Sequence, residues 1–277
     1  MTNGTSSGDA HARYSLVDLM RVMARLRDPK DGCPWDLEQD FCSIVPSTIE
    51  ECYELADAIE RNDLPHIAEE LGDVLFQVIF YSQLGAEQGA FDFHTVVDTL
   101  VRKLIRRHPH VFAEGAIEGR LNTAISPAQV KANWEAIKRE ERAGKAHHGI
   151  LDDIPVTLPA LQRAQKLQKR AATVGFDWPT LDAVLANLEG EITELRDALG
   201  GGNDGHISDE FGDVLFSVVN LGRHLGLDAE TALRHANTKF ETRFTAMERA
   251  AVDEDSELAG ESMSQLQARW EQVKSSE

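Results

Sequence analysis

The sequence contains few cysteines. Only Cys33, Cys42 and Cys52 occur among 277 residues, no two of them form a Cys-x-x-Cys pair, and any pairing would leave one over. A reducing compartment is the simplest interpretation of this pattern. We therefore expect a cytoplasmic protein.

Long hydrophobic runs are also missing. The densest apolar stretch, residues 74–80, is interrupted by Gln77 and is far too short to span a bilayer. The first dozen residues contain no apolar stretch, so we expect residues 1–13 to be a flexible tail and not a signal peptide. The sequence thus predicts no membrane association.

Positive charge is scarce, because 28 Lys and Arg residues stand against 47 Asp and Glu residues and leave a net charge of −19. Such a charge repels nucleic acids and acidic membrane surfaces, so we expect no direct nucleic-acid binding. Aromatic residues make up only 6%, but the hydrophobic share of 42% is ample for a buried core and excludes a disordered chain. The sequence has no Walker-type phosphate loop, no Gly-x-Ser-x-Gly and no dinucleotide-binding fingerprint.

The sequence contains an internal repeat. Glu-Leu-Ala-Asp-Ala-Ile begins at Glu54 and Glu-Leu-Arg-Asp-Ala-Leu at Glu194, while Glu-Leu-Gly-Asp-Val-Leu-Phe begins at Glu70 and Glu-Phe-Gly-Asp-Val-Leu-Phe at Glu210. Both pairs are offset by 140 residues, and the four tryptophans fall into two further pairs, 35 with 178 and 134 with 270. We predict a first copy over residues 14–142 and a second over residues 159–277. Glycines, histidines and Pro155, with Pro159 directly after, make residues 143–158 a linker.

Each copy has the apolar periodicity of helices. Hydrophobic residues recur at intervals of three and four, and Ser126-Pro127-Ala128-Gln129 has the pattern of a helix start. In the first copy, residues 62–65 end one helix and begin the next, and in the second copy a turn is expected at residues 200–205. No stretch alternates like a β-strand, so the sequence predicts an all-α protein of two helical bundles, each with four or five helices.

Acidic side chains gather on two adjacent predicted helices of each copy. Residues three or four apart share a helical face, and two helices joined by a short turn pack antiparallel, so four carboxylates should meet in each copy. Without a cation their repulsion is unfavourable, and oxygen-only ligands favour Mg²⁺, with Mn²⁺ as a further candidate. Solvated surface carboxylates are the alternative, but the second copy preserves the same separations. The predicted metal ligands are Glu51, Glu54, Glu70 and Asp73 in the first copy and Glu191, Glu194, Glu210 and Asp213 in the second.

Cationic and aromatic residues also recur in both copies. The ammonium and guanidinium groups could meet phosphate, and a tryptophan ring could stack on a base. Taken singly, such residues are more often core or surface groups, and only the repeat favours a functional role. The set comprises Lys103, Arg107, Trp134 and Lys138 in the first copy and Lys239, Arg243, Trp270 and Lys274 in the second. We expect Trp35 and Trp178, by contrast, to anchor the turn that follows the first helix of each copy.

Acidic clusters beside basic residues are typical of a metal-assisted phosphoanhydride hydrolase, in which metal ions bridge carboxylates and a nucleoside triphosphate. More specifically, Glu50-Glu51-Cys-Tyr-Glu54 followed by Glu70-Leu-Gly-Asp73 resembles the Glu-Glu-x-x-Glu and Glu-x-x-Asp signature of the two-domain bacterial MazG nucleoside triphosphate pyrophosphohydrolases. The similarity extends through Gly32-Cys-Pro-Trp-Asp36 and Val174-Gly-Phe-Asp-Trp178.

The resemblance implies tandem all-α MazG domains, a homodimer, Mg²⁺ dependence, and conversion of NTPs and dNTPs to the monophosphate and pyrophosphate. It also implies metal binding by the carboxylates of the second copy, and a substrate-binding or catalytic role for its Lys, Arg and Trp set. The first-copy residues take these roles only through the repeat. One departure is Gly190, which stands where the first copy has Glu50. The competing hypothesis is a nucleotide-sensing or scaffold module that binds a metal–nucleotide complex or a protein partner without chemistry.

Overall fold

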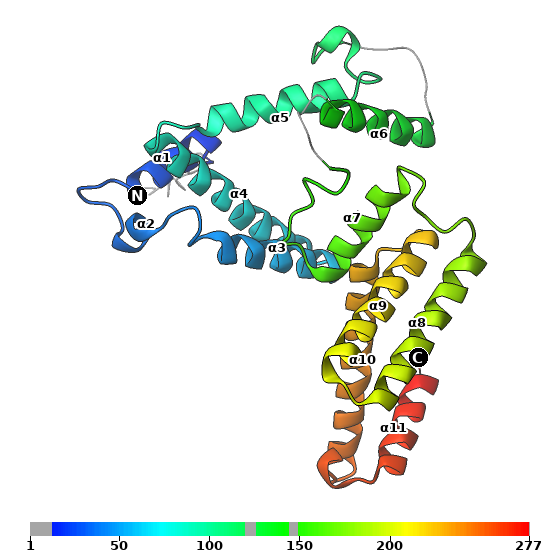
Figure 1. Ribbon diagram of the computed structural model, residues 1–277. Helices are drawn as coiled ribbons and strands as arrows, with labels where there is room; N and C mark the ends of the chain where they lie inside the picture. Colours follow the sequence, from blue (N-terminus) through cyan, green and yellow to red (C-terminus); the bar gives the residue numbers. More distant parts are fainter. Residues whose placement is uncertain (1–12, 120–125, 144–148, 277) are drawn as a thin grey trace, which may run out of the picture. The chain divides into compact units, whose positions relative to one another are not determined.

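The computed structural model describes residues 13–119, 126–143 and 149–276 (Figure 1). It divides into two compact units, residues 1–141 and residues 142–277, which we call the first and second units. The predicted tail and part of the predicted linker lie outside the described residues. No strand occurs in the described ranges, so the all-α prediction is confirmed.

The first unit is built from six α-helices in its described part. They are α1 (Leu16–Leu26), α2 (Pro34–Glu38), α3 (Val45–Glu60), α4 (Leu64–Glu87), α5 (Phe93–Arg107) and α6 (Pro127–Ala143), with a 3-10 turn at Ala113–Gly115. The expectation of four or five helices is wrong here, since α2 has only five residues and is too short to show helical periodicity.

The second unit contains α7 (Ala160–Ala172), α8 (Leu181–Gly201), α9 (Asp204–His224), α10 (Ala229–Asp253) and α11 (Met263–Ser275), with a 3-10 turn at Leu258–Gly260. Helices α8 and α9 pack along each other, as α3 and α4 do in the first unit, and α7 and α10 pack against α9 (Figure 1).

Both helix pairs are joined by tight turns whose residues fit the backbone they adopt. Asn62 has a φ of 54° after α3, and the side chain of Asp63 caps α4 by accepting from the backbone N–H of His66. After α8, Gly202 has a φ of 69°, and the side chain of Asn203 caps α9. The second turn is shorter than the predicted residues 200–205, because the flanking glycines remain helical.

The two units fill their interiors differently. In the first, Met23, Ile44, Ile79, Phe80 and Leu84 form a hydrophobic core between α1, α4 and the residue before α3. In the second, the buried apolar side chains are mostly small, and they lie on α8, α9 and α10. They are Val184, Ala198, Val219, Met247 and Ala251.

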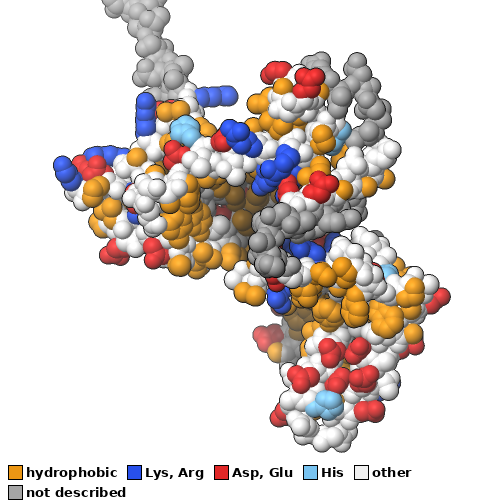
Figure 2. Space-filling model, turned by 45° about the horizontal axis from the view of Figure 1, so that its top comes forward, with side chains coloured by type: hydrophobic (Ala, Val, Ile, Leu, Met, Phe, Trp, Pro, Cys, Tyr) orange, Lys and Arg blue, Asp and Glu red, His pale blue; other side chains and the backbone are white. Residues whose placement is uncertain are grey.

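Large apolar side chains also remain exposed on both units, as Figure 2 shows. On α4 they include Leu71, Leu75 and Val78, and on α9 the residues at the same repeat positions, Phe211, Leu215 and Val218. Because this spacing follows one helical face, each unit carries an apolar stripe at the same place in the repeat. No helix in the described part is both long and apolar enough to cross a bilayer.

Candidate functional site

The first carboxylate cluster lies between α3 and α4. One carboxylate oxygen from each of Glu51, Glu70 and Asp73 lies within 4.8 Å of the others. Glu54, one turn after Glu51, is close enough to raise the pKa of Glu51. The structure therefore brings the four first-copy carboxylates into one neighbourhood, with three of them in direct reach of a single ion.

The second cluster lies between α8 and α9. Here oxygens of Glu191, Glu194 and Glu210 lie within 4.8 Å of one another. Asp213 is near enough to raise the pKa of Glu191. The two clusters thus differ in which of the four carboxylates lies outside the close group of three. It is Glu54 in the first copy and Asp213 in the second.

Each cluster holds a carboxylate oxygen that is buried without a hydrogen bond. These atoms are Oε2 of Glu70 and Oε2 of Glu210, which occupy the same repeat position. A buried, unpaired carboxylate oxygen is unfavourable, and hard divalent cations are bound by such oxygens. The donor set of both clusters therefore fits a hard divalent cation.

The electrostatics of the two clusters agree. Burial, and then the neighbouring carboxylates Asp73, Glu54, Glu70 and Glu50, raise the pKa of Glu51. Burial first, and then Glu194, Asp213 and Glu210, raise the pKa of Glu191, while a hydrogen bond from Asn187 opposes the shift. The raised pKa values mean that the charged forms of Glu51 and Glu191 are disfavoured. A bound cation would stabilise these charged forms.

Two histidines hold the central carboxylates, and our sequence analysis did not identify them. His66 Nε2 lies 2.6 Å from Oε1 of Glu70, and His206 Nδ1 lies 3.3 Å from Oε1 of Glu210. The signal was present, since these histidines are also 140 residues apart and each precedes its glutamate by one helical turn. Each histidine lies against one oxygen of its glutamate, and the other oxygen is the one that is buried without a hydrogen bond.

The first-copy cationic set lies on α5 and α6. Arg107 donates to Glu141 at 2.6 Å, and the ring of Trp134 lies 5.9 Å from that of His108. Lys103 is on the same helix as Arg107, and the side chain of Lys138 lies outside the described residues. Arg107 is thus already bound by a carboxylate of its own unit.

The second-copy set lies on α10 and α11. The guanidinium of Arg243 lies over the ring of Trp270 at 5.6 Å, and Phe240 lies beside the same ring at 5.5 Å. Lys274 binds Glu271 at 2.9 Å, and Lys239 is one turn before Arg243. The structure brings Arg243 and Trp270 together.

In the second unit, the described contacts of Lys239, Trp270 and Lys274 lie apart from the carboxylate cluster. Among the described residues, Lys239, Trp270 and Lys274 make no hydrogen bond or ion pair to the carboxylate cluster. A ligand long enough to span both, such as a polyphosphate, would be needed to connect them.

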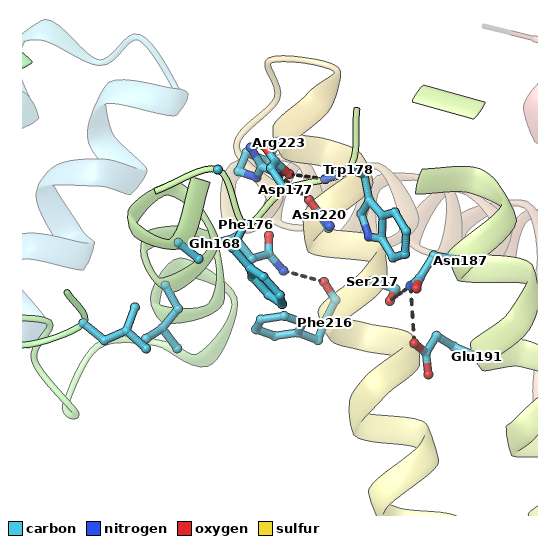
Figure 3. A pocket seen from close by; sticks show the side chains of 14 residues that line it. Gln168, Phe176, Asp177, Trp178, Asn187, Glu191, Phe216, Ser217, Asn220 and Arg223 are labelled. Atoms are coloured by element: carbon cyan, nitrogen blue, oxygen red, sulfur yellow. Dashed lines mark hydrogen bonds and ion pairs between the residues drawn. The ribbon is translucent and has the colours of Figure 1, made fainter. Parts of the chain in front are cut away.

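A cavity of about 610 Å³ adjoins the second cluster, since Glu191 forms part of its wall. Figure 3 shows Phe176, Phe216 and Trp178 around it, together with the polar side chains of Gln168, Asn187, Ser217 and Asn220. Trp178, in the segment between α7 and α8, therefore also lines a cavity. Asp177 and Arg223, joined by an ion pair with a hydrogen bond at 2.9 Å, support the same wall.

The sequence around both carboxylate clusters is similar to a known protein family. A family model described as the MazG nucleotide pyrophosphohydrolase domain matches the chain twice, at residues 39–112 and 179–247, and each match contains one carboxylate cluster. A nucleoside triphosphate pyrophosphohydrolase of Escherichia coli is 49% identical over 263 residues, which cover 94% of this chain and 97% of that protein.

Two further relatives carry the same activity in their names. The nucleoside triphosphate pyrophosphohydrolase/pyrophosphatase MazG of Thermotoga maritima is 41% identical over 257 residues, covering 93% of this chain and 94% of that protein. A nucleoside triphosphate pyrophosphohydrolase of Mycobacterium tuberculosis is 36% identical over 202 residues, covering 70% of this chain and 58% of that protein. With two matches to the family's domain and relatives that align along nearly all of its length, the chain belongs to the MazG nucleotide pyrophosphohydrolase family.

Proposed function

We propose that this protein is an Mg²⁺-dependent nucleoside triphosphate pyrophosphohydrolase, which converts NTPs and dNTPs to the monophosphate and pyrophosphate. The observation that carries the proposal is the pair of carboxylate clusters, each with a buried glutamate oxygen that has no hydrogen-bond partner. Family membership and the names of the relatives support the reaction.

In this proposal the second cluster holds Mg²⁺ through Glu191, Glu194, Glu210 and Asp213, and the first through Glu51, Glu54, Glu70 and Asp73. A bound divalent ion supplies charge neutralisation for phosphate oxygens and a water of lowered pKa. A carboxylate within the cluster can accept the proton of that water. His206 lies against Oε1 of Glu210 and would keep this carboxylate in place to hold a cation.

Lys239, Arg243, Trp270 and Lys274 serve the triphosphate in the second copy. The guanidinium and ammonium groups offer donors to phosphate oxygens, and the Trp270 ring, already under Arg243, holds that guanidinium in place. Lys103, Arg107, Trp134 and Lys138 are the corresponding set of the first copy.

The decisive test identifies products. The full chain is incubated with each NTP and dNTP and Mg²⁺, and products are separated by ion-exchange chromatography. We expect monophosphate and pyrophosphate, with loss of turnover when Mg²⁺ is chelated. Release of orthophosphate with a diphosphate would contradict the proposed position of cleavage.

Metal binding is tested separately with Mn²⁺, whose spin resonance signal reports the free ion. We expect Glu70→Gln and Glu210→Gln each to weaken binding at one cluster by at least about tenfold, because each replacement removes one ligand charge. Glu69→Gln and Asp209→Asn are matched controls, since these exposed carboxylates directly precede the ligands. If the controls and the ligand variants bind Mn²⁺ equally, the assignment of the metal ligands is wrong.

The alternative is a sensing or scaffold module that binds a metal–nucleotide complex or a protein without hydrolysing the nucleotide. It predicts nucleotide binding in the calorimeter and no product at any time point. The same two clusters would then serve only as a docking point.

We also propose a homodimer. Its support is the exposed apolar stripe at the same position of α4 and of α9, which a second copy of the chain would cover. Sedimentation should report twice the mass of one chain, and Leu75→Glu together with Leu215→Glu should reduce it to one. We place the protein in the cytoplasm, because its three cysteines are unpaired, and expect no direct nucleic-acid binding because of its net charge of −19.

A further inference from the structure

A chain of side-chain contacts runs from the end of α3 to the first carboxylate cluster. Nε of Arg61 lies 2.9 Å from Oδ2 of Asp57, and Nη2 of the same guanidinium lies 2.8 Å from Nδ1 of His66. Nε2 of His66 in turn lies 2.6 Å from Oε1 of Glu70. The chain therefore ends at one of the carboxylates that form the cluster.

The chemistry of arginine fixes the direction of these hydrogen bonds. A guanidinium has only donors, so Nδ1 of His66 accepts from Arg61. The proton of the neutral imidazole ring is then on Nε2, which donates to Oε1 of Glu70. Arg61 thus selects the histidine tautomer that can hold Glu70.

The turn between α3 and α4 brings Arg61 and His66 together. Arg61 is the last residue of the helical backbone of α3, and Asn62, with a φ of 54°, reverses the chain. Asp63 then caps α4 by accepting from the backbone N–H of His66. His66 is therefore held through its backbone and through both ring nitrogens, although its side chain is 35% exposed.

This support acts on the most buried carboxylate of the first cluster. The side chain of Glu70 is only 8% exposed, and its Oε2 is buried without a hydrogen bond. A carboxylate that is already held in place loses little freedom when it binds a cation. Hydrogen bonds behind a metal ligand therefore strengthen metal binding, commonly by about 10–100-fold.

The second unit lacks this support. The residues 140 positions after Asp57, Arg61 and His66 are Asp197, Gly201 and His206. A glycine has no side chain, so this position offers no guanidinium to join the aspartate to the histidine. The side chain of His206 is 57% exposed, and its contact with Glu210 is made by Nδ1 at 3.3 Å. The histidine of the second unit thus lies farther from its glutamate and contacts it through the other ring nitrogen.

From these contacts, and resting on the metal ligands of the proposed function, we infer that Arg61 is a positioning residue of the first carboxylate cluster. It holds His66 in the tautomer that fixes Glu70, so the first cluster is preformed for a divalent cation. In the absence of nucleotide, the first cluster then binds the cation more tightly than the second. The first unit keeps its metal at concentrations that leave the second unit empty.

One substitution separates a positioning role of Arg61 from a purely electrostatic one. Arg61→Ala removes a positive charge near a cation site, which by charge alone should strengthen metal binding. If Arg61 acts by positioning His66, the same change should weaken it. Arg61→Lys keeps both a charge and a donor for His66. Arg102→Ala is the matched control, since Arg102 is also an exposed arginine whose Nε pairs with an aspartate one turn earlier, Asp98, at 2.7 Å.

Binding of Mn²⁺ to the full chain is followed by spin resonance in the Glu210→Gln background, in which the first cluster is the intact one. We expect Arg61→Ala to weaken binding about three- to tenfold, Arg61→Lys to stay within about twofold, and Arg102→Ala to have no effect. The Glu70→Gln chain, in which the second cluster is the intact one, should bind Mn²⁺ at least about threefold more weakly than the Glu210→Gln chain. Circular dichroism verifies the fold of each variant.

Nitrogen-15 NMR of the metal-free chain tests the tautomer directly. Long-range proton–nitrogen spectra distinguish a protonated from an unprotonated ring nitrogen, and the signal that disappears in His66→Asn belongs to His66. At mildly alkaline pH we expect the proton on Nε2 and none on Nδ1. A proton on Nδ1 would exclude the hydrogen bond from Arg61 and overturn the inference.

Unchanged or stronger Mn²⁺ binding in Arg61→Ala also overturns the inference, and so does a second cluster that binds as tightly as the first. Either result keeps the proposed metal ligands, provided that Glu70→Gln combined with Glu210→Gln abolishes tight binding. If this double variant binds Mn²⁺ like the wild type, the metal ligands are refuted and the inference with them. None of these measurements depends on turnover.

Discussion

The two units share a cluster of carboxylates and differ in what lies beside it. In the first unit, Phe80 closes a hydrophobic core next to the cluster, and in the second, Asn220 stands at the same repeat position and a cavity opens there. At this repeat position the first unit has a buried aromatic ring, and the second unit has a polar side chain that lines a cavity. Duplication preserved the charges of the site, while the neighbouring positions diverged.

The largest effect we predict is on the free energy of unfolding of the first unit, because this unit is stabilised by its filled hydrophobic core. Phe80→Ala should lower the free energy of unfolding of that unit by about 3–5 kcal/mol, because it leaves a cavity among Met23, Ile79 and Leu84. Asn220→Ala should lower that of the second unit by about 1 kcal/mol, since it removes one hydrogen bond to Arg223. Urea titrations followed by circular dichroism measure both, and equal losses would contradict the contrast between the cores.

The next effect is on turnover. Glu210→Gln should reduce kcat/KM for an NTP at least about 100-fold, equivalent to about 2.7 kcal/mol, because a cavity of about 610 Å³ adjoins this cluster, against about 430 Å³ beside Glu54 and Glu70. Glu70→Gln should change it by less than about twofold. Steady-state kinetics on the two variants provide the comparison. If Glu70→Gln is the more damaging change, the first unit carries the reaction.

A smaller effect concerns pH. Arg107, followed by Arg106, lowers the pKa of Glu141 to about 2, whereas the second-unit counterpart of Arg107, Arg243, lies over Trp270. Because the folded pKa lies below the ordinary value, the carboxylate stabilises the first unit above about pH 4.5, and this is lost as the pH falls towards 2. The contribution should be about 1–2 kcal/mol for this partly exposed pair.

Urea unfolding at pH 7 and pH 3 checks this. Glu141→Gln should lose about that amount at pH 7 and roughly half as much at pH 3, where the folded-state carboxylate is still mostly ionised. A variant that is equally destabilised at both values would show that the ion pair is not the cause.

The smallest effect is expected where the copies agree. Ser126 caps α6 and Ser262 caps α11, each in a reciprocal arrangement with a glutamine three residues later. Ser126→Ala and Ser262→Ala should each lower the free energy of unfolding by about 0.5–1 kcal/mol, and the two losses should be similar. Thermal melts of the two variants test this equality, and a threefold difference would show that the two caps are not equivalent.

Much of this structure follows from local patterns. The helix pairs, the turn at residues 62–63 and the cap at Ser126 depend on residues close in sequence, and the sequence predicted them. The carboxylate clusters were predicted because antiparallel packing of adjacent helices fixes which faces meet. Glycines at positions 200 and 201 continue the helix against their own propensity, because α8 packs along α9 over its length.

The cavity could not be predicted in the same way. It depends on α7, a loop, α8 and α9, so it arises from residues far apart in the sequence. An internal repeat reveals the positions at which the two copies agree. Positions 80 and 220 differ between the copies, so the repeat does not single them out. The pairing of Arg107 with Glu141 and of Arg243 with Trp270 likewise depends on tertiary packing, which helical periodicity does not encode.

Phe80 and Asn220 should also give the two halves of the chain separate responses to heat. A scanning calorimeter would then record two heat-absorption peaks, the later one from the half with the filled core. A ligand that binds the folded second unit should move the earlier peak upward and bring the two together.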